Sequence, residues 1–256
     1  MKLTNSISIS GTTGTGKTYG VCKLVNDMGL KAVVLDFENK TEKTVKLLFP
    51  ETTDRFEIIP VMLRKEEPKT DITKTGKITA RDMKIILKNG PDYLKSFLNL
   101  KDNLINDILE RSDFDVLVYD GATPILRNNM GLEYWRMLHP DRDNPMPEEW
   151  GAMNDIERAF IEGGVGWAEE NNGLFIVTGQ MKDLYRGDKV IGEVPALSMK
   201  VQHTIDVTLQ VEKKIGLKTE YVCTCLDSIK GQWIENLTYD RHIIDVLIEK
   251  ELIGYD

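Results

Sequence analysis

The stretch ISGTTGTGKTYG, residues 9–20, decides the fold class of this chain. From Gly11 to Thr18 it matches the spacing G-x-x-x-x-G-K-[ST] of a phosphate-binding loop. A short strand is expected before it, at residues 6–10, and an amphipathic helix after it, at Thr18–Met28. The alternative is a glycine-rich turn with a chance lysine, which would not need these flanking elements. The motif therefore predicts that a nucleoside triphosphate binds here.

In a loop of this kind the backbone N–H groups and the positive end of the following helix hold the phosphates. Lys17 is expected to reach the β and γ phosphates, and the Thr18 hydroxyl is expected to bind Mg²⁺. The predicted nucleotide-binding residues are Gly11, Thr12, Thr13, Gly14, Thr15, Gly16, Lys17, Thr18 and Tyr19.

Length and composition limit the remaining possibilities. With 256 residues, the chain is expected to form one domain, residues 1–256. Its net charge of −8 opposes general attraction to nucleic acid, so contact with DNA would need a local basic loop. Three cysteines predict no disulfide framework. The start, MKLTNSISIS, lacks an apolar signal-peptide core, and no apolar run approaches the roughly 18 residues of a membrane span. We expect a cytoplasmic protein with no membrane partner.

Apolar runs predict a parallel sheet around the loop. After the first helix, Lys31–Phe37 is typical of a strand covered on both faces, which completes a βαβ unit. Further strands are expected at Phe56–Val61, Asp115–Tyr119, Leu174–Thr178, Ile205–Val211 and Tyr221–Leu226, and helices at Asp92–Arg111, Asn154–Glu170 and from Asp240 to about Leu252. The expected fold class is α/β, with a mostly parallel sheet, helices on both faces and antiparallel strands at the C-terminal edge. Two segments interrupt this pattern: a polar insertion at about residues 62–82 and a long loop at about residues 122–151.

Three polar side chains follow predicted strands. The run DVLVYD places Asp120 at the end of a buried strand, where a carboxylate that holds Mg²⁺ belongs; a turn aspartate is the alternative. In VVLDFEN, residues 33–39, period two puts Asp36 and Glu38 on one side of the strand. Glu38 could polarise a water molecule in line with the γ-phosphate, or it could be a solvated acidic strand end. Gln180 ends LFIVTGQ and could contact the γ-phosphate, or it could simply open a loop.

Together these motifs resemble the RecA-like ATPases over most of the chain, from Ile7 to about Lys230. That family places an acidic residue at the end of the strand after the phosphate loop, then a strand ending in aspartate, then one ending in glutamine. The resemblance implies Mg²⁺-dependent ATP hydrolysis, with Glu38 activating water and Gln180 sensing the γ-phosphate. The stretch EEWGAMN and the segment PALSMKVQHTIDVTLQV are similar to those of the compact phage-type members linked to single-strand annealing and recombination. Gly121 departs from the pattern, because recombinases often have serine there.

The resemblance also implies partners. RecA-like assemblies often lend a cation to the neighbouring subunit from just past a late edge strand, a position that Lys230 occupies here, with Lys200 as second choice and a solvated turn lysine as the alternative. We therefore expect a homo-oligomer, as a ring or filament, and single-stranded DNA and a single-strand binding protein as partners. Two loops beside the nucleotide are expected to meet DNA, through Arg127, Arg136 and Arg142 in residues 122–151 and Lys182, Arg186 and Lys189 in residues 181–194. Two other functions stay open, a hexameric helicase or packaging motor and a regulatory switch that binds ATP without hydrolysing it.

Overall fold

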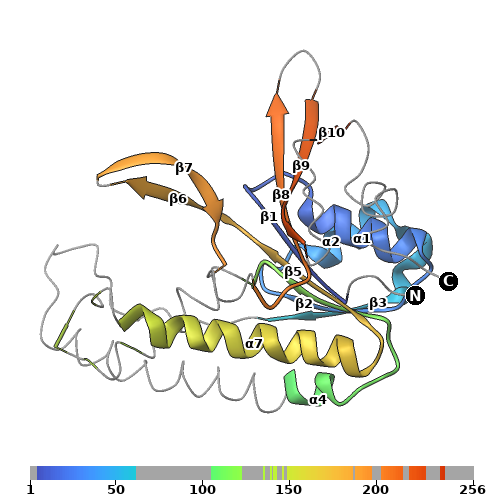
Figure 1. The fold of residues 1–256 in the computed structure, drawn as a ribbon. Helices are drawn as coiled ribbons and strands as arrows, with labels where there is room; N and C mark the ends of the chain where they lie inside the picture. The colour runs from blue at the N-terminus through green and yellow to red at the C-terminus, as the bar shows by residue number, and fades with distance from the viewer. Residues whose placement is uncertain are drawn as a thin grey trace, which may run out of the picture.

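Figure 1 shows the computed structural model of the chain, which describes residues 5–61, 105–122, 135, 139, 141–142, 146, 149–186, 188–197, 203–215, 219–228 and 237–239. The helices are α1 (Lys17–Asp27), α2 (Thr41–Leu48), the 3₁₀ helix η1 (Pro50–Arg55), α4 (Asn106–Leu109) and α7 (Trp150–Glu170). The strands are β1 (Ser6–Gly11), β2 (Ala32–Asp36), β3 (Phe56–Pro60), β4 (Val116–Asp120), β5 (Leu174–Gly179), β6 (Met181–Arg186), β7 (Lys189–Pro195), β8 (Val207–Ile215), β9 (Thr219–Ser228) and β10 (Leu237–Tyr239).

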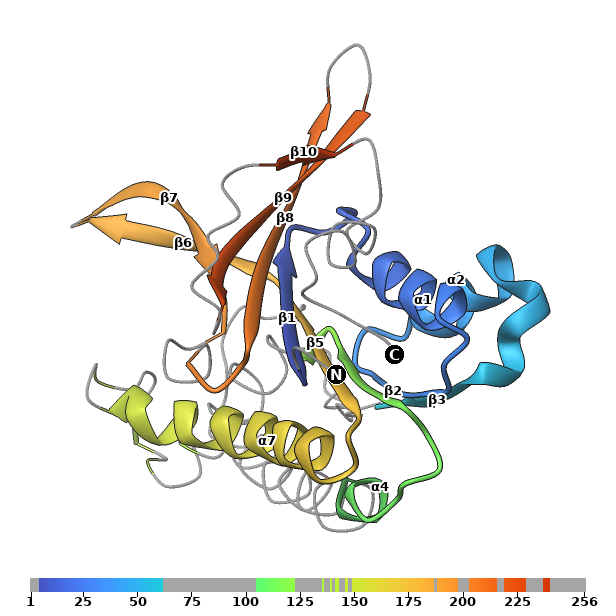
Figure 2. The ribbon, with the colours of Figure 1, turned by 45° about the vertical axis from the view of Figure 1, so that its right-hand side comes forward.

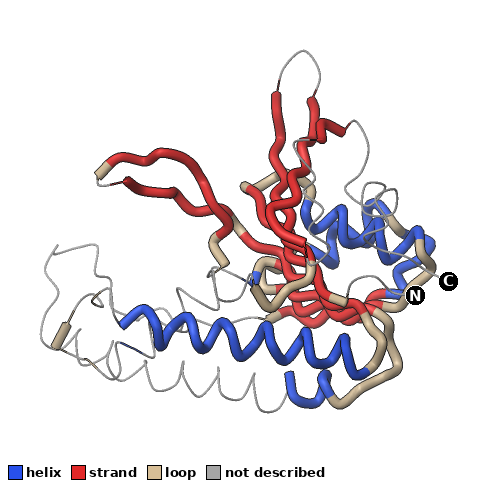
Figure 3. The backbone as a smooth tube through the Cα atoms, viewed as in Figure 1, coloured by secondary structure: helices blue, strands red, loops and turns tan. Residues whose placement is uncertain are grey.

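Within these residues, one eight-stranded sheet forms the centre of the fold, in the order β10-β9-β8-β1-β5-β4-β2-β3. The strands from β8 to β3 are all parallel to their neighbours, whereas β9 and β10 pair antiparallel at one edge. A separate antiparallel hairpin, β6 and β7, projects from the body (Figure 3). The expected mostly parallel sheet with antiparallel C-terminal edge strands is thus confirmed.

Helices cover both faces of the sheet, as Figure 2 shows. Side chains from alternate positions of each central strand point to opposite faces, so the strands contribute to two apolar clusters. Val34 and Ile176 pack with α1 and α2 residues, including Leu24 and Val45. Leu35, Tyr119 and Phe175 belong to the other cluster, with Ile108 of α4 and Ile161 and Trp167 of α7. β2, β4 and β5 are apolar on both faces and form continuous buried runs, as a covered parallel sheet requires, whereas β1 alternates isoleucine with the buried Ser6, Ser8 and Ser10.

Most predicted elements lie within a few residues of their expected bounds, but two expectations were wrong. The helix expected from Asn154 begins earlier, at Trp150. The segment 181–194 is a β-hairpin rather than a loop, and the pair Gly187–Asp188 between its strands is a turn signal that could have revealed it. Within the expected loop at 122–151, the described residues Ala122 and Trp135 have helical backbone.

Several other expectations fall on residues that the structure does not describe. These are the polar insertion at 62–82, most of the loop at 122–151, the first part of the helix at Asp92–Arg111 and the closing helix after Asp240. In the described part of the chain, no helix is both long and apolar enough to cross a membrane.

Candidate nucleotide-binding site

The phosphate loop joins the end of β1 to the start of α1. Gly16 has φ +84° immediately before the helix, a left-handed conformation that a side chain would strain. The helix then starts at Lys17, and the Gly20 N–H donates to the Gly16 carbonyl at 2.8 Å. Because the first N–H groups of a helix have no partner within it, this turn places backbone donors at the loop, where an anion would bind.

Lys17 lies over the loop. Its Nζ donates to the carbonyl oxygens of Gly11 at 2.7 Å and Thr12 at 2.9 Å. Burial lowers the pKa of Lys17, while the charges of Glu38 and Asp120 oppose this shift and that of Lys40 adds to it. The ammonium therefore lies between the loop and the acidic side chains at the ends of β2 and β4.

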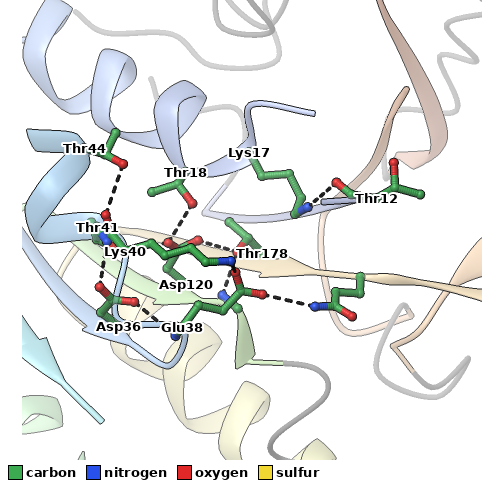
Figure 4. A network of polar contacts seen from close by, with 12 residues as sticks. Thr12, Lys17, Thr18, Asp36, Glu38, Lys40, Thr41, Thr44, Asp120 and Thr178 are labelled. Carbon is green, nitrogen blue, oxygen red and sulfur yellow. Dashed lines mark hydrogen bonds and ion pairs between the residues drawn. The ribbon is translucent and has the colours of Figure 1, made fainter. Parts of the chain in front are cut away.

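Asp120 is the buried acid at the centre of the site, with 3% of its surface exposed. Its Oδ2 accepts hydrogen bonds from the hydroxyls of Thr18 at 2.8 Å and Thr41 at 2.9 Å, and its Oδ1 accepts one from Thr178 at 2.5 Å (Figure 4). Burial raises the pKa of Asp120, although the three hydroxyls favour the charged form. The sequence interpretation singled out Thr18 and missed Thr41 and Thr178.

Thr18 and Asp120 fit the Mg²⁺ role expected of them. Their oxygens lie 2.8 Å apart, and hydroxyl and carboxylate oxygens are ligands that Mg²⁺ accepts. Among the described residues, no three His, Cys, Asp or Glu side chains cluster as a metal site. An ion here would therefore complete its octahedron with phosphate oxygens and water, which is how Mg²⁺ binds beside nucleotides.

Asp36 organises the turn that leads from β2 to α2. Its Oδ1 accepts the Glu38 N–H at 3.1 Å, and its Oδ2 accepts the Thr41 N–H at 2.7 Å. Asn39 within the turn has φ +55°. The two acids of VVLDFEN thus have different tasks, because the carboxylate of Asp36 binds backbone while that of Glu38 remains for other partners.

Both oxygens of the Glu38 carboxylate have partners. Oε2 accepts a hydrogen bond from Lys40 Nζ at 2.9 Å, and Oε1 accepts one from Gln180 Nε2 at 3.2 Å (Figure 4). Burial opposes ionisation of Glu38, but the bonds from Lys40 and Gln180 and the charges of Lys40 and Lys17 together lower its pKa. The fold therefore joins Glu38, which follows β2, to Gln180, which follows β5, whereas the predicted contact of Gln180 with the γ-phosphate stays a prediction.

Gly121 is the residue that makes room for Glu38. A Cβ at this position would lie 2.3 Å from Glu38 Cγ, and the backbone has φ +76°. The Gly121 N–H donates to Thr178 Oγ1 at 2.8 Å, which fixes the turn after β4. The departure from serine at this position therefore has a steric reason in this chain.

If this site hydrolyses ATP, Gly121→Ala should slow turnover by about ten-fold to a hundred-fold, because displacing a reacting group by about 1 Å can cost that much. The variant should keep its affinity for ADP, since Lys17 and the loop are untouched. Phosphate release and ADP titration measure the two effects. Gly166→Ala is the matched control, because a Cβ there contacts nothing within 4 Å. Unchanged turnover in Gly121→Ala would show that Glu38 need not lie where the structure places it.

The arginine and lysine candidates for DNA binding differ in their surroundings. Arg142 donates to both oxygens of Glu149, at 2.7 Å each, and lies 5.1 Å from the ring centroid of Trp135. Trp135 is buried, so this group packs the segment together. Arg127 and Arg136 lie outside the described residues.

The basic residues of the hairpin are placed differently. Arg186 and Lys189 face each other across its last described pair, and both are exposed. Lys182 lies near its base and is half-buried. The same hairpin exposes Leu184, Val190 and Ile191 by 41% to 57% of their surface. Asp183, Asp188 and Glu193 of the hairpin are exposed as well and balance its three basic side chains, so the projecting surface is apolar and of mixed charge.

The structure says less about the other predicted site residues. Tyr19 stacks on Phe49, with ring centroids 5.6 Å apart, beside the phosphate loop. Lys230 and Lys200 lie outside the described residues, so the predicted cation from a neighbouring subunit stays a prediction.

Comparisons with known proteins add little beyond this geometry. No protein-family model matches the sequence, and a search of curated proteins finds no match. Among solved structures, the chain is similar to one described as the crystal structure of the RadB recombinase. The two are 14% identical, the match covers 93% of this chain and 87% of the other, and the TM-score is 0.49. At that distance the overlay transfers no residue role to this chain.

Proposed function

We propose that this chain is a Mg²⁺-dependent ATP hydrolase that acts on DNA, in single-strand annealing or recombination of the phage type. One observation carries the proposal: a connected hydrogen-bond network brings the phosphate loop together with the strand-end residues. Thr18 bonds Asp120, Thr41 links Asp120 to Asp36, and Asp36 holds the Glu38 backbone. Gln180 then bonds the Glu38 carboxylate. A chance glycine-rich turn would not need this assembly.

Each residue of the site has its own role in hydrolysis. The loop N–H groups and Lys17 hold and neutralise the phosphates. Thr18 and Asp120 would hold Mg²⁺, which when bound neutralises charge on the β and γ phosphates. Glu38 accepts a proton from the attacking water, and Gln180, one hydrogen bond away, contacts the γ-phosphate. Hydrolysis is favoured because the Glu38 carboxylate beside the loop is placed to accept a proton from water.

The hairpin is the part of the fold that supports coupling to DNA. Gln180 directly precedes β6, and its carbonyl accepts the Ala196 N–H from the other end of the hairpin at 2.8 Å. Both hairpin ends therefore meet at the residue that touches Glu38. Exposed Arg186 and Lys189 face each other at the last described pair of the hairpin, with the exposed Asp188 beside them, on a protein whose net charge is −8. These two side chains are the proposed phosphate contacts.

We expect the double variant Arg186→Ala, Lys189→Ala to bind single-stranded DNA more weakly and with a smaller dependence on salt. Losing two phosphate contacts should reduce the slope of log affinity against log salt by about 1.4. A fluorescence titration with an oligonucleotide at several salt concentrations measures this slope. Lys213→Ala, Lys214→Ala removes two exposed lysines from β8 and serves as control. An unchanged slope in the hairpin variant would place the DNA contacts elsewhere.

The proposal includes the assembly that the family resemblance implies. The chain acts as a homo-oligomer in the cytoplasm, that of the host if the protein is viral. Lys230 of one subunit supplies charge to the γ-phosphate held by the next, and a single-strand binding protein is a further partner. Native mass in each nucleotide state tests this, because a monomer that is fully active would exclude a shared site.

A regulatory switch is the second candidate function, because the described structure holds both Glu38 oxygens in hydrogen bonds. ATP turnover separates the two functions. Phosphate release that rises with single-stranded DNA supports the hydrolase. Tight ATP binding with no phosphate release, with or without DNA, would support the switch and contradict the hydrolase.

A further inference from the structure

Lys40 is the one residue of the Glu38 network to which the chemistry above gives no task. It lies two residues after Glu38, and its Nζ donates to Glu38 Oε2 at 2.9 Å. Gln180 holds Oε1, so neither carboxylate oxygen is without a protein donor. Each oxygen keeps a second lone pair that can accept from water, but an ammonium bonded to the carboxylate stabilises its charged form and makes it a weaker base. Turnover is therefore favoured when one of these two donors, above all the cationic Lys40, leaves Glu38.

Of the two donors to Glu38, Lys40 is the one whose side chain can move away. Its backbone is fixed, because the Lys40 carbonyl accepts hydrogen bonds from the N–H and the hydroxyl of Thr44, each at 3.1 Å. Its side chain is 58% exposed and ends in one ion pair with Glu38, which is 26% exposed. An ion pair exposed to this degree contributes little to stability, so a stronger anion can take the ammonium.

The position of the ammonium indicates which anion that is. The stem of Lys40 runs past Asp120 to the Glu38 carboxylate, on the side of the phosphate loop (Figure 4). Lys17 donates to the loop carbonyls, and Lys40 donates to Glu38 in the same polar network (Figure 4). Two ammonium groups in one network favour a ligand with more than one negative charge. A γ-phosphate at the loop meets that description.

We propose that Lys40 is a second cation for the γ-phosphate, supplied by the same chain, which moves from Glu38 to the phosphate when ATP binds. This inference rests on the proposed function and adds a way in which the site distinguishes ATP from ADP. The exchange has two effects: it neutralises charge at the phosphorus, and it frees Glu38 Oε2. The water oxygen then bonds to the γ-phosphorus while the bond from that phosphorus to the β–γ bridging oxygen breaks. ADP leaves with the electron pair of that bond, and the water proton passes to Glu38 Oε2.

Lys40→Met tests this, because methionine keeps the apolar stem and removes the charge. We expect the affinity for the non-hydrolysable β,γ-imido analogue of ATP to fall by about ten-fold or more, while that for ADP stays within about two-fold. Turnover should fall by more than the loss of analogue affinity, because the charge is also lost from the transition state. Lys40→Arg should restore most of the discrimination between analogue and ADP. Calorimetric titration with Mg²⁺ and each nucleotide measures these affinities.

Lys46→Met is the matched control, since Lys46 forms a comparable pair with Glu42 on the outer side of α2 and should change neither affinity. Equal losses for analogue and ADP, or an unchanged ratio, would overturn the proposal. Faster turnover in Lys40→Met would also overturn it, because Lys40 would then only restrain Glu38. If Lys17→Ala also binds the analogue normally, the phosphate site itself lies elsewhere, which is a failure of the proposed function and not of Lys40 alone.

A mixing experiment separates Lys40 from a cation lent by a neighbour. Lys40→Met subunits keep an intact phosphate loop, and Lys17→Ala subunits keep Lys40. A residue that acts within its own chain cannot be replaced by the partner, so the mixture should show no more turnover than the sum of its parts. Recovered turnover would assign Lys40 to the neighbouring site and contradict the same-chain role.

Discussion

Lys17→Ala should reduce ATP affinity by about a hundred-fold or more, since it removes the charge-assisted hydrogen bonds that the loop directs at two phosphates. No other described lysine donates to the loop carbonyls, where Lys17 Nζ bonds Gly11 and Thr12. The fold should survive the change, because the contacts that are lost lie within one surface loop. ATP titration, with thermal unfolding as a check on folding, measures the effect.

Lys23→Ala is the control for this variant. Lys23 lies on the same helix and pairs with Asp27, away from the loop, so ATP affinity should be unchanged. A Lys17→Ala protein that binds ATP as the unmodified chain does would show that the nucleotide site lies elsewhere.

Glu38→Gln should bind ATP with nearly normal affinity and lose turnover by about a hundred-fold to ten-thousand-fold, which is the usual contribution of a general base. The amide keeps the shape of the side chain and an acceptor oxygen but cannot take the proton from water. Because the backbone N–H of residue 38 bonds Asp36, the turn before α2 should stay in place. Phosphate release and ATP titration on the same preparation separate chemistry from binding.

The control is Glu42→Gln, an exposed glutamate on α2 that pairs with Lys46. It should turn over ATP normally. Equal rates in Glu38→Gln and the unmodified protein would remove Glu38 from the mechanism and leave the water without a base in the described site.

The parallel sheet could be predicted because its strands are apolar on both faces and end in polar residues. β2, β4 and β5 appear in the sequence as runs that stop at Asp36, Asp120 and Gly179. In a parallel sheet these ends meet at one edge, so a strand-by-strand interpretation was enough to bring Glu38, Asp120 and Gln180 together. The helix α2 and the 3₁₀ helix η1 were missed because they span only eight and six residues, and few of these are apolar.

The partners that complete the site could not be predicted in the same way. Thr41 and Thr178 are ordinary threonines in the sequence, and their role depends on hydroxyls converging on Asp120 from three elements. The contact of Lys40 with Glu38 depends on the turn that Asp36 folds, where Asn39 has positive φ. The steric need for Gly121 depends on the path of the Glu38 side chain. Each arises from tertiary geometry that no local pattern encodes.

Phosphate release from Mg·ATP by the unmodified chain, measured beside Lys17→Ala and Glu38→Gln, decides whether this site hydrolyses ATP. We expect saturable release by the unmodified chain that rises with single-stranded DNA. We expect loss of release in both variants, with ATP affinity lost only in Lys17→Ala. Release at or below the level of the two variants, with and without DNA, while the unmodified chain binds ATP tightly, would contradict hydrolysis at this site.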